Sequence, residues 1–436
     1  MSVILAKELD TNFKYDVAES PGGETIKRCF ACGACTGGCL ISEQEEEFDP
    51  RKIIRKVLLG MRKEVLSSPY LWSCLMCHNC SFYCPQGVKF SEIVGVLREM
   101  AVKEGFVRHP LLQRLMLHNL LPFPGRMELI TRPVSLYESS GLQALVRRSK
   151  VLGRLSEKIG NWEYLIPPFP INPLRDRLKE VMPPRGEVKQ RVGYFMGCCD
   201  NFMFTSMALA TISVLHRNSC EVVVPRGQKC CGMPCNGYGE IEQARKLARH
   251  NIEAFEKTGV DIVVTDCATC GSTLKAYATF LQDDPEYAER ALAFSRKVQD
   301  LSEFLAGVVT ADHKLGEVKG TVTYHDSCHL LRDQKISQQP RQLINLIPGL
   351  EFVEMKESDR CCGGAGIYNL THYKNSMSIL KRKMGNIADT GADLIATGCL
   401  GCQVQLGMGV RWKGLKAKIV HPVELLEQAY KSGEGK

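Results

Sequence analysis

One arrangement of cysteines occurs twice in this chain. Each copy has a single cysteine, an adjacent pair followed by glycine, and a Cys-x-x-Cys pair, and equivalent cysteines lie 130 to 132 residues apart. The first set is Cys198, Cys230, Cys231, Cys267 and Cys270, and the second set is Cys328, Cys361, Cys362, Cys399 and Cys402. Adjacent side chains diverge, so they do not readily share one tetrahedral ion. Five converging thiolates suit a multi-iron cluster better than a single metal.

The two repeats resemble the cysteine-rich CCG modules of heterodisulfide reductase. They are also similar to the iron-sulfur subunits of glycolate and lactate oxidases. The reductase resemblance implies that each five-cysteine set holds a non-cubane [4Fe-4S] cluster and that these ten cysteines form the catalytic centre. Oxidase-type relatives often carry one degenerate repeat. Because both repeats are complete here, the resemblance favours the reductase.

A second cysteine pattern precedes the repeats. Two runs follow the spacing of two-cluster ferredoxins, in which the fourth cysteine of each run binds the cluster of the other run. The first run is Cys29, Cys32, Cys35 and Cys39, and the second run is Cys74, Cys77, Cys80 and Cys84. We therefore expect one cubane [4Fe-4S] cluster on Cys29, Cys32, Cys35 and Cys84, and another on Cys74, Cys77, Cys80 and Cys39. A zinc ribbon would leave the third and fourth cysteines of each run unused.

The segments beside these runs predict helices. Asp49 is an expected N-cap with Pro50 at the first helical position, and apolar residues then recur on one face. A second helix is expected from Ser91 as cap to Gly105. This frame resembles the helical ferredoxin domain of heterodisulfide reductase, which there belongs to a different polypeptide from the CCG modules, and that of succinate dehydrogenase-type proteins. The chain thus resembles a fusion of two heterodisulfide reductase polypeptides. Trp72 and His78 are expected to cover a cluster.

Residues 106–190 differ in composition from the rest. They contain half of the chain's 20 prolines and carry most of its net charge of +8. We expect a basic connector with short helices, including an apolar stretch from Leu111 to Leu121. Its basic residues either are solvated along the chain's own domains or form a docking surface for an acidic carrier, a partner subunit or an anionic membrane face.

The repeats read as alternating strands and helices. In the first, strands are expected at 192–196, 220–224 and 262–265, with a helix at 241–258. In the second, strands are expected at 322–324, 352–355 and 394–397, with a helix at 370–390. The cysteines then fall at the carboxyl ends of strands, where open α/β sheets bind ligands, and two facing modules would bring both clusters to one cleft.

These patterns define the expected fold class. An α-helical two-cluster ferredoxin domain (1–105) is followed by the connector (106–190) and by two tandem α/β CCG modules (191–310 and 311–436). Glycines 363, 364 and 366 do not form a nucleotide-binding fingerprint. Glycine after the paired cysteines instead lets the backbone wrap closely and direct N–H groups at sulfur. We expect no flavin or nucleotide in this chain.

Five further residues have no assigned role. Cys199 and Cys220 have no counterpart in the second repeat, and Cys220 is expected to be a buried small hydrophobe. Cys235 is either similarly buried or a redox thiol near the cleft. His325 and His329 flank Cys328, where they form structural hydrogen bonds or donate a proton to a departing thiolate.

The composition of the whole chain limits the expected location and partners of the protein. No secretion signal opens the sequence. The apolar segment 201–216, which lacks Asp, Glu, Lys and Arg, has only 16 residues, too short to span a bilayer. Twenty-one cysteines in such a chain favour metal binding over disulfides. We expect a cytoplasmic protein without nucleic-acid partners, which reaches a membrane only through another subunit.

Two functions remain open. In the first, electrons from a partner subunit reach the two cubane clusters, and the two non-cubane clusters then reduce a disulfide, one electron to each sulfur. In the alternative, the chain is the relay subunit of a flavin-dependent glycolate or lactate dehydrogenase or of another large electron-transfer complex. The sequence does not identify the disulfide, the acceptor or the direction of flow.

Overall fold

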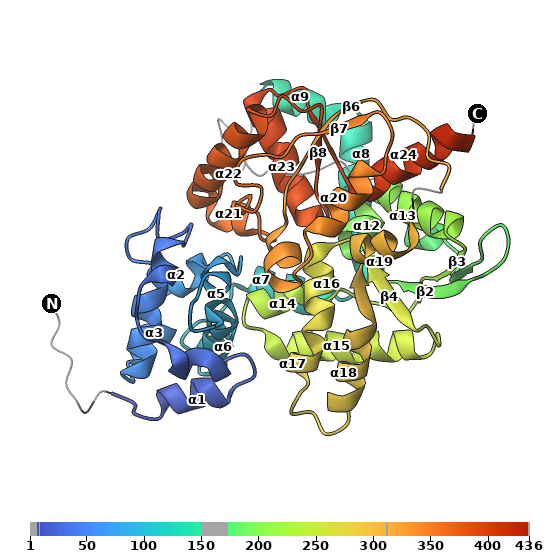
Figure 1. Ribbon diagram of the computed structural model, residues 1–436. Helices are drawn as coiled ribbons and strands as arrows, with labels where there is room; N and C mark the ends of the chain where they lie inside the picture. The colour runs from blue at the N-terminus through green and yellow to red at the C-terminus, as the bar shows by residue number, and fades with distance from the viewer. Residues whose placement is uncertain (1–6, 8, 150–172, 311–312, 435–436) are drawn as a thin grey trace.

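The computed structural model describes residues 7, 9–149, 173–310 and 313–434. The N-terminal domain, drawn in blue, lies beside two α/β modules, drawn in green to yellow and in orange to red (Figure 1). In the described residues no helix is long and apolar enough to cross a membrane.

The N-terminal domain is helical, with no β-strand between residues 9 and 105. Asp49 caps its helix as expected, because its Oδ1 accepts a hydrogen bond from the Lys52 amide at 3.1 Å. The α-helices are α1 (Phe13–Glu19), α2 (Ala34–Gly37), α3 (Pro50–Leu58), α4 (Arg62–Leu66), α5 (Asn79–Phe82) and α6 (Phe90–Lys103). Two 3-10 helices, η2 (Glu24–Arg28) and η3 (Pro69–Ser73), precede the two cysteine runs.

The expected cap at Ser91 is wrong. Helix α6 begins at Phe90, and Lys89 occupies the cap position. Ser91 instead serves a neighbouring segment: its amide donates to Ser81 Oγ at 3.3 Å and its hydroxyl lies 3.7 Å from Cys80 Sγ. The serine therefore fixes the second cysteine run rather than the end of the helix.

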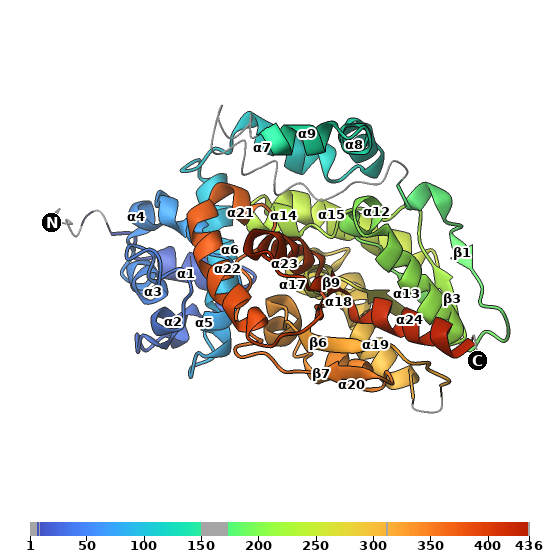
Figure 2. The ribbon, with the colours of Figure 1, turned by 90° about the horizontal axis from the view of Figure 1, so that it is seen from above.

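The helices of the connector form a layer over the rest of the molecule (Figure 2), whereas its strand β1 (Val181–Met182) joins the sheet of the first module. It contains the short helices that the sequence predicted: α7 (Leu111–Leu115), the π-helical turn η4 (Met116–Leu120), α8 (Pro124–Ser139) and α9 (Leu142–Ser149). Leu117 and Leu120 are buried, whereas Leu111 and Leu112 are exposed. Residues 150–172 of the predicted connector lie outside the described residues.

Each module contains a parallel sheet with the same strand order. In the first, the order is β1-β3-β2-β4-β5 with only β1 antiparallel, and in the second it is β7-β6-β8-β9. The first sheet comprises β1 (Val181–Met182), β2 (Gln190–Tyr194), β3 (Cys220–Val223), β4 (Ile262–Thr265) and β5 (Val298–Asp300). The second comprises β6 (Gly320–Tyr324), β7 (Leu350–Phe352), β8 (Leu394–Ala396) and β9 (Lys418–Val420).

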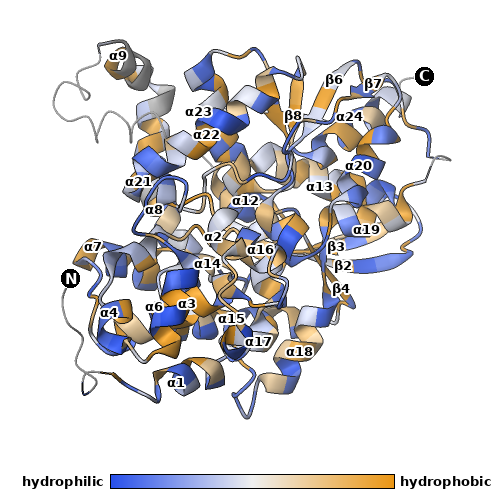
Figure 3. Cartoon of the chain, turned by 60° about the vertical axis from the view of Figure 1, so that its left-hand side comes forward, coloured by the Kyte–Doolittle hydropathy of each residue, from blue (hydrophilic) through white to orange (hydrophobic). Residues whose placement is uncertain are grey.

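The predicted strands are present, with shifted ends. The largest difference is β7, which was expected at 352–355 but runs from Leu350 to Phe352. Its register explains the shift, because Leu350 pairs with Gly320 at the start of β6, and residues 353–355 lie beyond the pairing. Apolar side chains concentrate on β4 and β8, which are buried between helices (Figure 3).

The helices of the two modules are α12 (Cys198–Phe202), α13 (Thr205–Arg217), α14 (Met233–Gly237), α15 (Ile241–Glu256), α16 (Ala268–Lys275), α17 (Tyr277–Phe280), α18 (Ala288–Lys297), α19 (Leu301–Val308), the π-turn η6 (His329–Asp333), α20 (Gln338–Asn345), α21 (Tyr368–Thr371), α22 (Tyr373–Ala388), α23 (Leu400–Lys413) and α24 (Pro422–Glu434). The last helix of each module packs on the other module, α24 on α13 and α19 on α20. The two modules consequently share one continuous apolar core.

Candidate iron-sulfur sites

The two five-cysteine sets lie at the carboxyl ends of equivalent strands. Cys198 and Cys267 follow β2 and β4, and Cys328 and Cys399 follow β6 and β8. Nine of the ten cysteines are buried and Cys198 is half-buried, and none of the ten forms a disulfide. The sheet edges therefore gather these thiols in the interior, at the position that open parallel sheets offer for ligands.

Within each set the thiols interact in the same order. In the first set Cys198 meets Cys230, Cys230 meets Cys231, Cys231 meets Cys270, and Cys270 meets Cys267. The second set repeats this order from Cys328 through Cys361, Cys362 and Cys402 to Cys399, with 3.6 Å between the Cys362 and Cys402 sulfurs. The duplication in sequence is therefore a duplication of the site.

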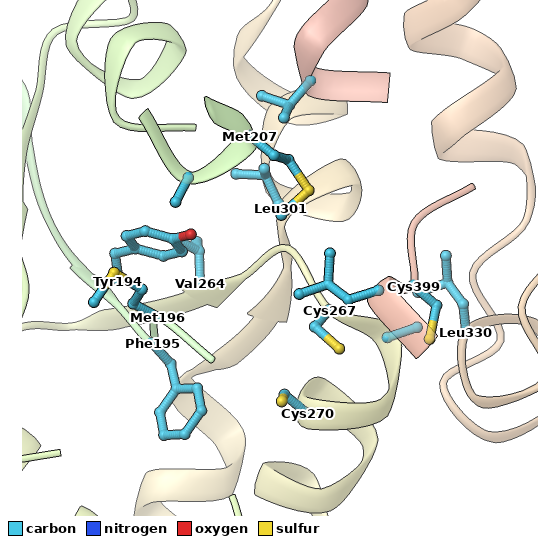
Figure 4. Close-up of a cluster of buried hydrophobic side chains, with 14 of the residues drawn as sticks. Tyr194, Phe195, Met196, Met207, Val264, Cys267, Cys270, Leu301, Leu330 and Cys399 are labelled. Carbon is cyan, nitrogen blue, oxygen red and sulfur yellow. The ribbon is translucent and has the colours of Figure 1, made fainter. Parts of the chain in front are cut away.

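The two sets meet at one equivalent position. The Cys267 thiol interacts with Cys399, its counterpart in the second module. The Ala268 amide donates to Gly398 O at 2.9 Å, and the Thr269 hydroxyl lies 3.3 Å from Cys399 Sγ. Figure 4 shows Cys267 and Cys270 beside the buried side chains around β4, with Cys399 approaching from the other module. Cysteines of both sets thus form one continuous line.

The glycine after each cysteine pair adopts the left-handed conformation, with φ of +95° at Gly232 and +83° at Gly363. A Cβ at Gly363 would lie 2.7 Å from Ser376 O, so the loop could not pack on α22 with any other residue. The Gly363 amide also donates to Cys361 Sγ at 3.5 Å. Close wrapping of the backbone around sulfur, expected from the sequence, is present here.

The fourth cysteine of each N-terminal run lies beside the cysteines of the other run. Cys29, Cys32, Cys35 and Cys84 line one small pocket, with Cys80 also at its wall. Cys39 lies instead near Cys74 and Cys80 of the second run. Each fourth cysteine is therefore beside the opposite run.

Both runs share an unusual backbone. Ala31 and Gly33 have positive φ, and so do Met76 and His78 at the equivalent positions, although three of these residues are not glycine. These turns direct amides at sulfur: Ala31 N lies 3.3 Å from Cys29 Sγ, and Met76 N lies 3.4 Å from Cys74 Sγ. Converging free thiols that accept amide hydrogen bonds are the donor set that iron-sulfur clusters use, so the residues fit [4Fe-4S] binding.

The second run also lies near the second set. Cys77 lies close enough to Cys328 and Cys361 for their charges to affect one another, and Arg332 lies beside all three. The Arg332 guanidinium donates to Cys77 O at 3.3 Å and to Asp359 O at 2.7 Å. The N-terminal domain thus meets the second module at a cysteine-to-cysteine junction, and the first module lies farther along the line.

A buried lysine and a buried neutral histidine lie beside the second set. Lys383 is fully buried next to Cys361 and Cys362, where burial lowers its pKa to about 8. His325 is also fully buried, and a ring nitrogen lies within 4.8 Å of the Cys362 and Cys402 sulfurs. Burial lowers the pKa of His325 to about 3, so the ring is neutral at pH 7.

Two buried carboxyl groups lie near the first set, whereas the second set has Lys383 and His325. Asp200 and Asp266 are fully buried, and burial together with their mutual repulsion raises the pKa of Asp200 well above its usual range. Asp266 accepts hydrogen bonds from Tyr194 at 2.5 Å and Thr211 at 2.8 Å. Phe195 stands where the second module has His325. Sequence reasoning missed Arg332, Lys383, Asp200 and Asp266, because nothing in their local pattern distinguishes them from ordinary charged residues.

The remaining cysteines have different environments. Cys199 interacts with Cys198 and faces Cys399, so it lies at the meeting point of the sets. Cys220 is buried in β3, as expected. Cys235 is 1% exposed, its thiol points at Leu117 O, and burial raises its pKa to about 12. These properties favour the buried-hydrophobe alternative for Cys235 over the redox thiol.

Trp72 and His78 lie beside the second run, in different surroundings. Trp72 stacks on Tyr238 and covers the buried Arg98, which donates to Leu71 O, Cys74 O and Gly237 O. This arrangement fixes the N-terminal domain against the first module. His78 packs edge-on against His329 of the second module, with 5.3 Å between ring centroids.

Three known protein families match parts of this chain. Residues 25–88 match a 4Fe-4S dicluster domain, and residues 192–275 and 322–407 match the cysteine-rich CCG domain. Residues 108–165, within the predicted connector, match the linker region of the glycolate oxidase iron-sulfur subunit. The resemblance predicted from the cysteines is therefore confirmed.

Curated relatives include subunits of oxidoreductases and a lactate utilization protein. A probable glycolate oxidase iron-sulfur subunit of Bacillus subtilis is 36% identical over 97% of each chain. A fumarate reductase (CoM/CoB) subunit of Methanothermobacter marburgensis is 29% identical over 93% of this chain and 72% of its own. Lactate utilization protein A of Oceanobacillus iheyensis is 30% identical over 56% of this chain and 99% of its own.

A solved structure shares the fold. A hypothetical protein from Helicobacter pylori superimposes with a TM-score of 0.52 over 95% of this chain and 73% of its own, at 11% identity. At that identity the likeness concerns the architecture alone.

Proposed function

The chain belongs to the family of glycolate oxidase iron-sulfur subunits, and from this premise we propose that it relays electrons from a flavoprotein that oxidises a 2-hydroxy acid. In general terms, the chain is an iron-sulfur electron-transfer subunit of an oxidoreductase complex. This relay role was the alternative in the sequence analysis. The Bacillus subtilis glycolate oxidase relative, 36% identical over 97% of each chain, favours it over disulfide reduction.

The observation that carries the proposal is the continuous line of cysteines. It runs from the N-terminal runs through the junction of Cys77 with Cys328 and Cys361, then along the second set, and across Cys399 and Cys267 into the first set. We propose two cubane [4Fe-4S] clusters on the crossed runs and two non-cubane [4Fe-4S] clusters on the five-cysteine sets. Such clusters exchange one electron at a time.

The surface end of this line is at the first run. Cys32 is exposed, and Phe30 beside it is 77% exposed. An exposed apolar residue next to a cluster loop allows close approach by a partner subunit. We propose that the flavoprotein or another electron-carrying subunit docks there, and that any membrane association occurs through such a partner.

Disulfide reduction is a second candidate, supported by a specific observation. Both five-cysteine sets are complete, and they meet directly at Cys267 and Cys399. Two adjacent one-electron centres suit a two-electron cleavage in which each sulfur receives one electron and one proton. A pure relay does not require this symmetry.

The test uses the complex purified anaerobically with its neighbouring subunits, which mass spectrometry identifies. Under the relay proposal, adding glycolate or lactate reduces the clusters, which is followed by electron paramagnetic resonance, and no disulfide reoxidises them. Cys362→Ala should stop electron transfer to an artificial acceptor, while Cys220→Ala, which removes a buried thiol outside both sets, should not.

The opposite pattern would reject the relay. Clusters that no 2-hydroxy acid reduces, but that a chemical reductant reduces and a disulfide then reoxidises with release of two thiols, would establish the second candidate. In that case Cys231→Ala and Cys362→Ala should each abolish thiol release, because one remaining centre supplies only a single electron.

A further inference from the structure

Three side chains with metal-binding groups converge where the N-terminal domain meets the second module. One ligand atom each of His78, His329 and Asp333 lies within 4.8 Å of the others. His329 and Asp333 are the first and last residues of the turn η6, and His78 immediately precedes α5. The three residues come from segments about 250 residues apart, and only the packing of the two domains brings them together.

The local backbone positions these groups. His78 adopts a left-handed φ of +59°, an uncommon conformation for a residue with a side chain. Its ring meets the His329 ring edge-on at an interplanar angle of 73°. The two imidazoles therefore converge from opposite domains while the neighbouring Cys77 and Cys328 belong to the cysteine line.

The first module supplies a fourth residue. Ser272, on α16, donates a hydrogen bond to Asp333 Oδ2, and its hydroxyl lies 3.3 Å from His329 Nδ1. A hydroxyl that holds a carboxylate oxygen fixes the orientation of the other oxygen, as residues that support metal ligands do. All three domains thus contribute to this cluster.

A cavity opens beside the cluster. It has a volume of about 260 Å³, and its wall includes His78, His329, Asp333 and Ser272. Met76 of the second run and Thr273, whose hydroxyl hydrogen-bonds to Cys231, also line it. The cavity accordingly gives a small ligand access to the histidines and the carboxylate without passing through the cysteine sets.

We propose that His78, His329 and Asp333 bind a divalent transition-metal ion of the zinc or ferrous type, separate from the iron-sulfur clusters. Two imidazoles and one carboxylate are the donor set of catalytic zinc sites and of non-haem ferrous sites, both of which keep a coordination position open. Here that position faces the cavity, where water or a small oxygen donor completes the coordination. The ion joins the N-terminal domain to the second module beside the Cys77 junction.

The experiment measures zinc binding to the complete, iron-loaded chain. Anaerobic protein is treated with a chelator that leaves the clusters intact, and Zn²⁺ alone is then added in equilibrium dialysis with elemental analysis. Wild type should retain a single zinc ion per chain in addition to its iron. Asp333→Asn should lose tight binding and Asp333→Glu should restore it. Ser272→Ala, which removes only the supporting hydroxyl, should weaken zinc binding roughly 10- to 100-fold.

Iron content provides the check on folding, and His250→Ala is the matched control. His250 is a partly exposed histidine whose ring nitrogen hydrogen-bonds with Gly227 O outside the cavity, so its removal should change neither metal. Zinc retention equal in wild type, Asp333→Asn and Ser272→Ala would overturn the proposal, and so would the absence of retained zinc in wild type. Should Asp333→Asn also lose iron, Ser272→Ala decides, because weaker zinc binding with full iron supports the site and unchanged binding refutes it.

Discussion

Replacing Arg332 by Gln should lower the reduction potentials of two of the four proposed clusters and leave those of the other two unchanged. The Arg332 side chain is 3% exposed and lies beside Cys77 of the second run and Cys328 and Cys361 of the second set. Burial disfavours its charge, but these cysteines raise the pKa of Arg332 above its ordinary value. A fixed positive charge there stabilises the reduced, more negative form of each neighbouring cluster.

The expected magnitude follows from Coulomb's law. A unit charge about 6 Å from the added electron contributes about 3 kcal/mol at an effective dielectric constant of about 20. For a one-electron couple this corresponds to about 120 mV. Loss of Arg332 should therefore lower both potentials by roughly that amount.

The assay is a redox titration followed by electron paramagnetic resonance, with iron content as the check on folding. Arg332→Lys is the matched control, because it keeps the charge and loses the planar donor geometry. Its potentials should stay near wild type. Equal shifts in Arg332→Gln and Arg332→Lys would show that hydrogen bonding, not charge, sets the potentials. Equal shifts in all four clusters, including the one near Cys29, would refute the local placement of the charge.

Two other predictions follow from the same structure. Cys84→Ser should remove the cluster of the first run and spare that of the second, since Cys84 lines the pocket with Cys29, Cys32 and Cys35; spectral loss confined to the second run would contradict the crossed assignment. Burial lowers the pKa of His421 to about 4, so the folded state binds fewer protons than the unfolded state and loses stability as the pH falls from about 6.5 toward 4. By pH 5 the loss should reach about 2 kcal/mol in the free energy of unfolding. In denaturation curves His421→Gln should remove about 2 kcal/mol of the loss at pH 5 and leave the part due to other buried histidines such as His325, while His250→Gln should leave the loss unchanged.

Local patterns were enough to predict much of the architecture. Asp49 and Pro50 indicated a helix start because capping involves neighbours within one turn, and Asp49 caps the helix as expected. Short apolar strands such as β4 were found because they are buried on both faces. Ser91 misled the same reasoning, since its partners, Ser81 and Cys80, lie outside its own helix.

The grouping of cysteines also came from the sequence. Spacing alone indicated five thiols in each repeat, and the resemblance to known families implied which clusters they hold. The sequence predicted that two facing modules bring both clusters to one cleft, but it did not indicate that Cys267 meets Cys399 or that Cys77 lies near the second set. Those junctions depend on how whole domains pack.

The surroundings of the two sets depend on tertiary structure for a physical reason. A cysteine motif records covalent spacing, which limits where the thiols lie along one segment. The charge that acts on them comes from segments distant in sequence, such as Lys383 on α22, and Coulomb forces in a buried site act through space rather than along the chain. The sequence thus determined that this protein gathers four groups of cysteines. Only the packing of α/β modules, with α24 on α13 and α19 on α20, decided that these groups form one line with cations near the second set and carboxylates near the first.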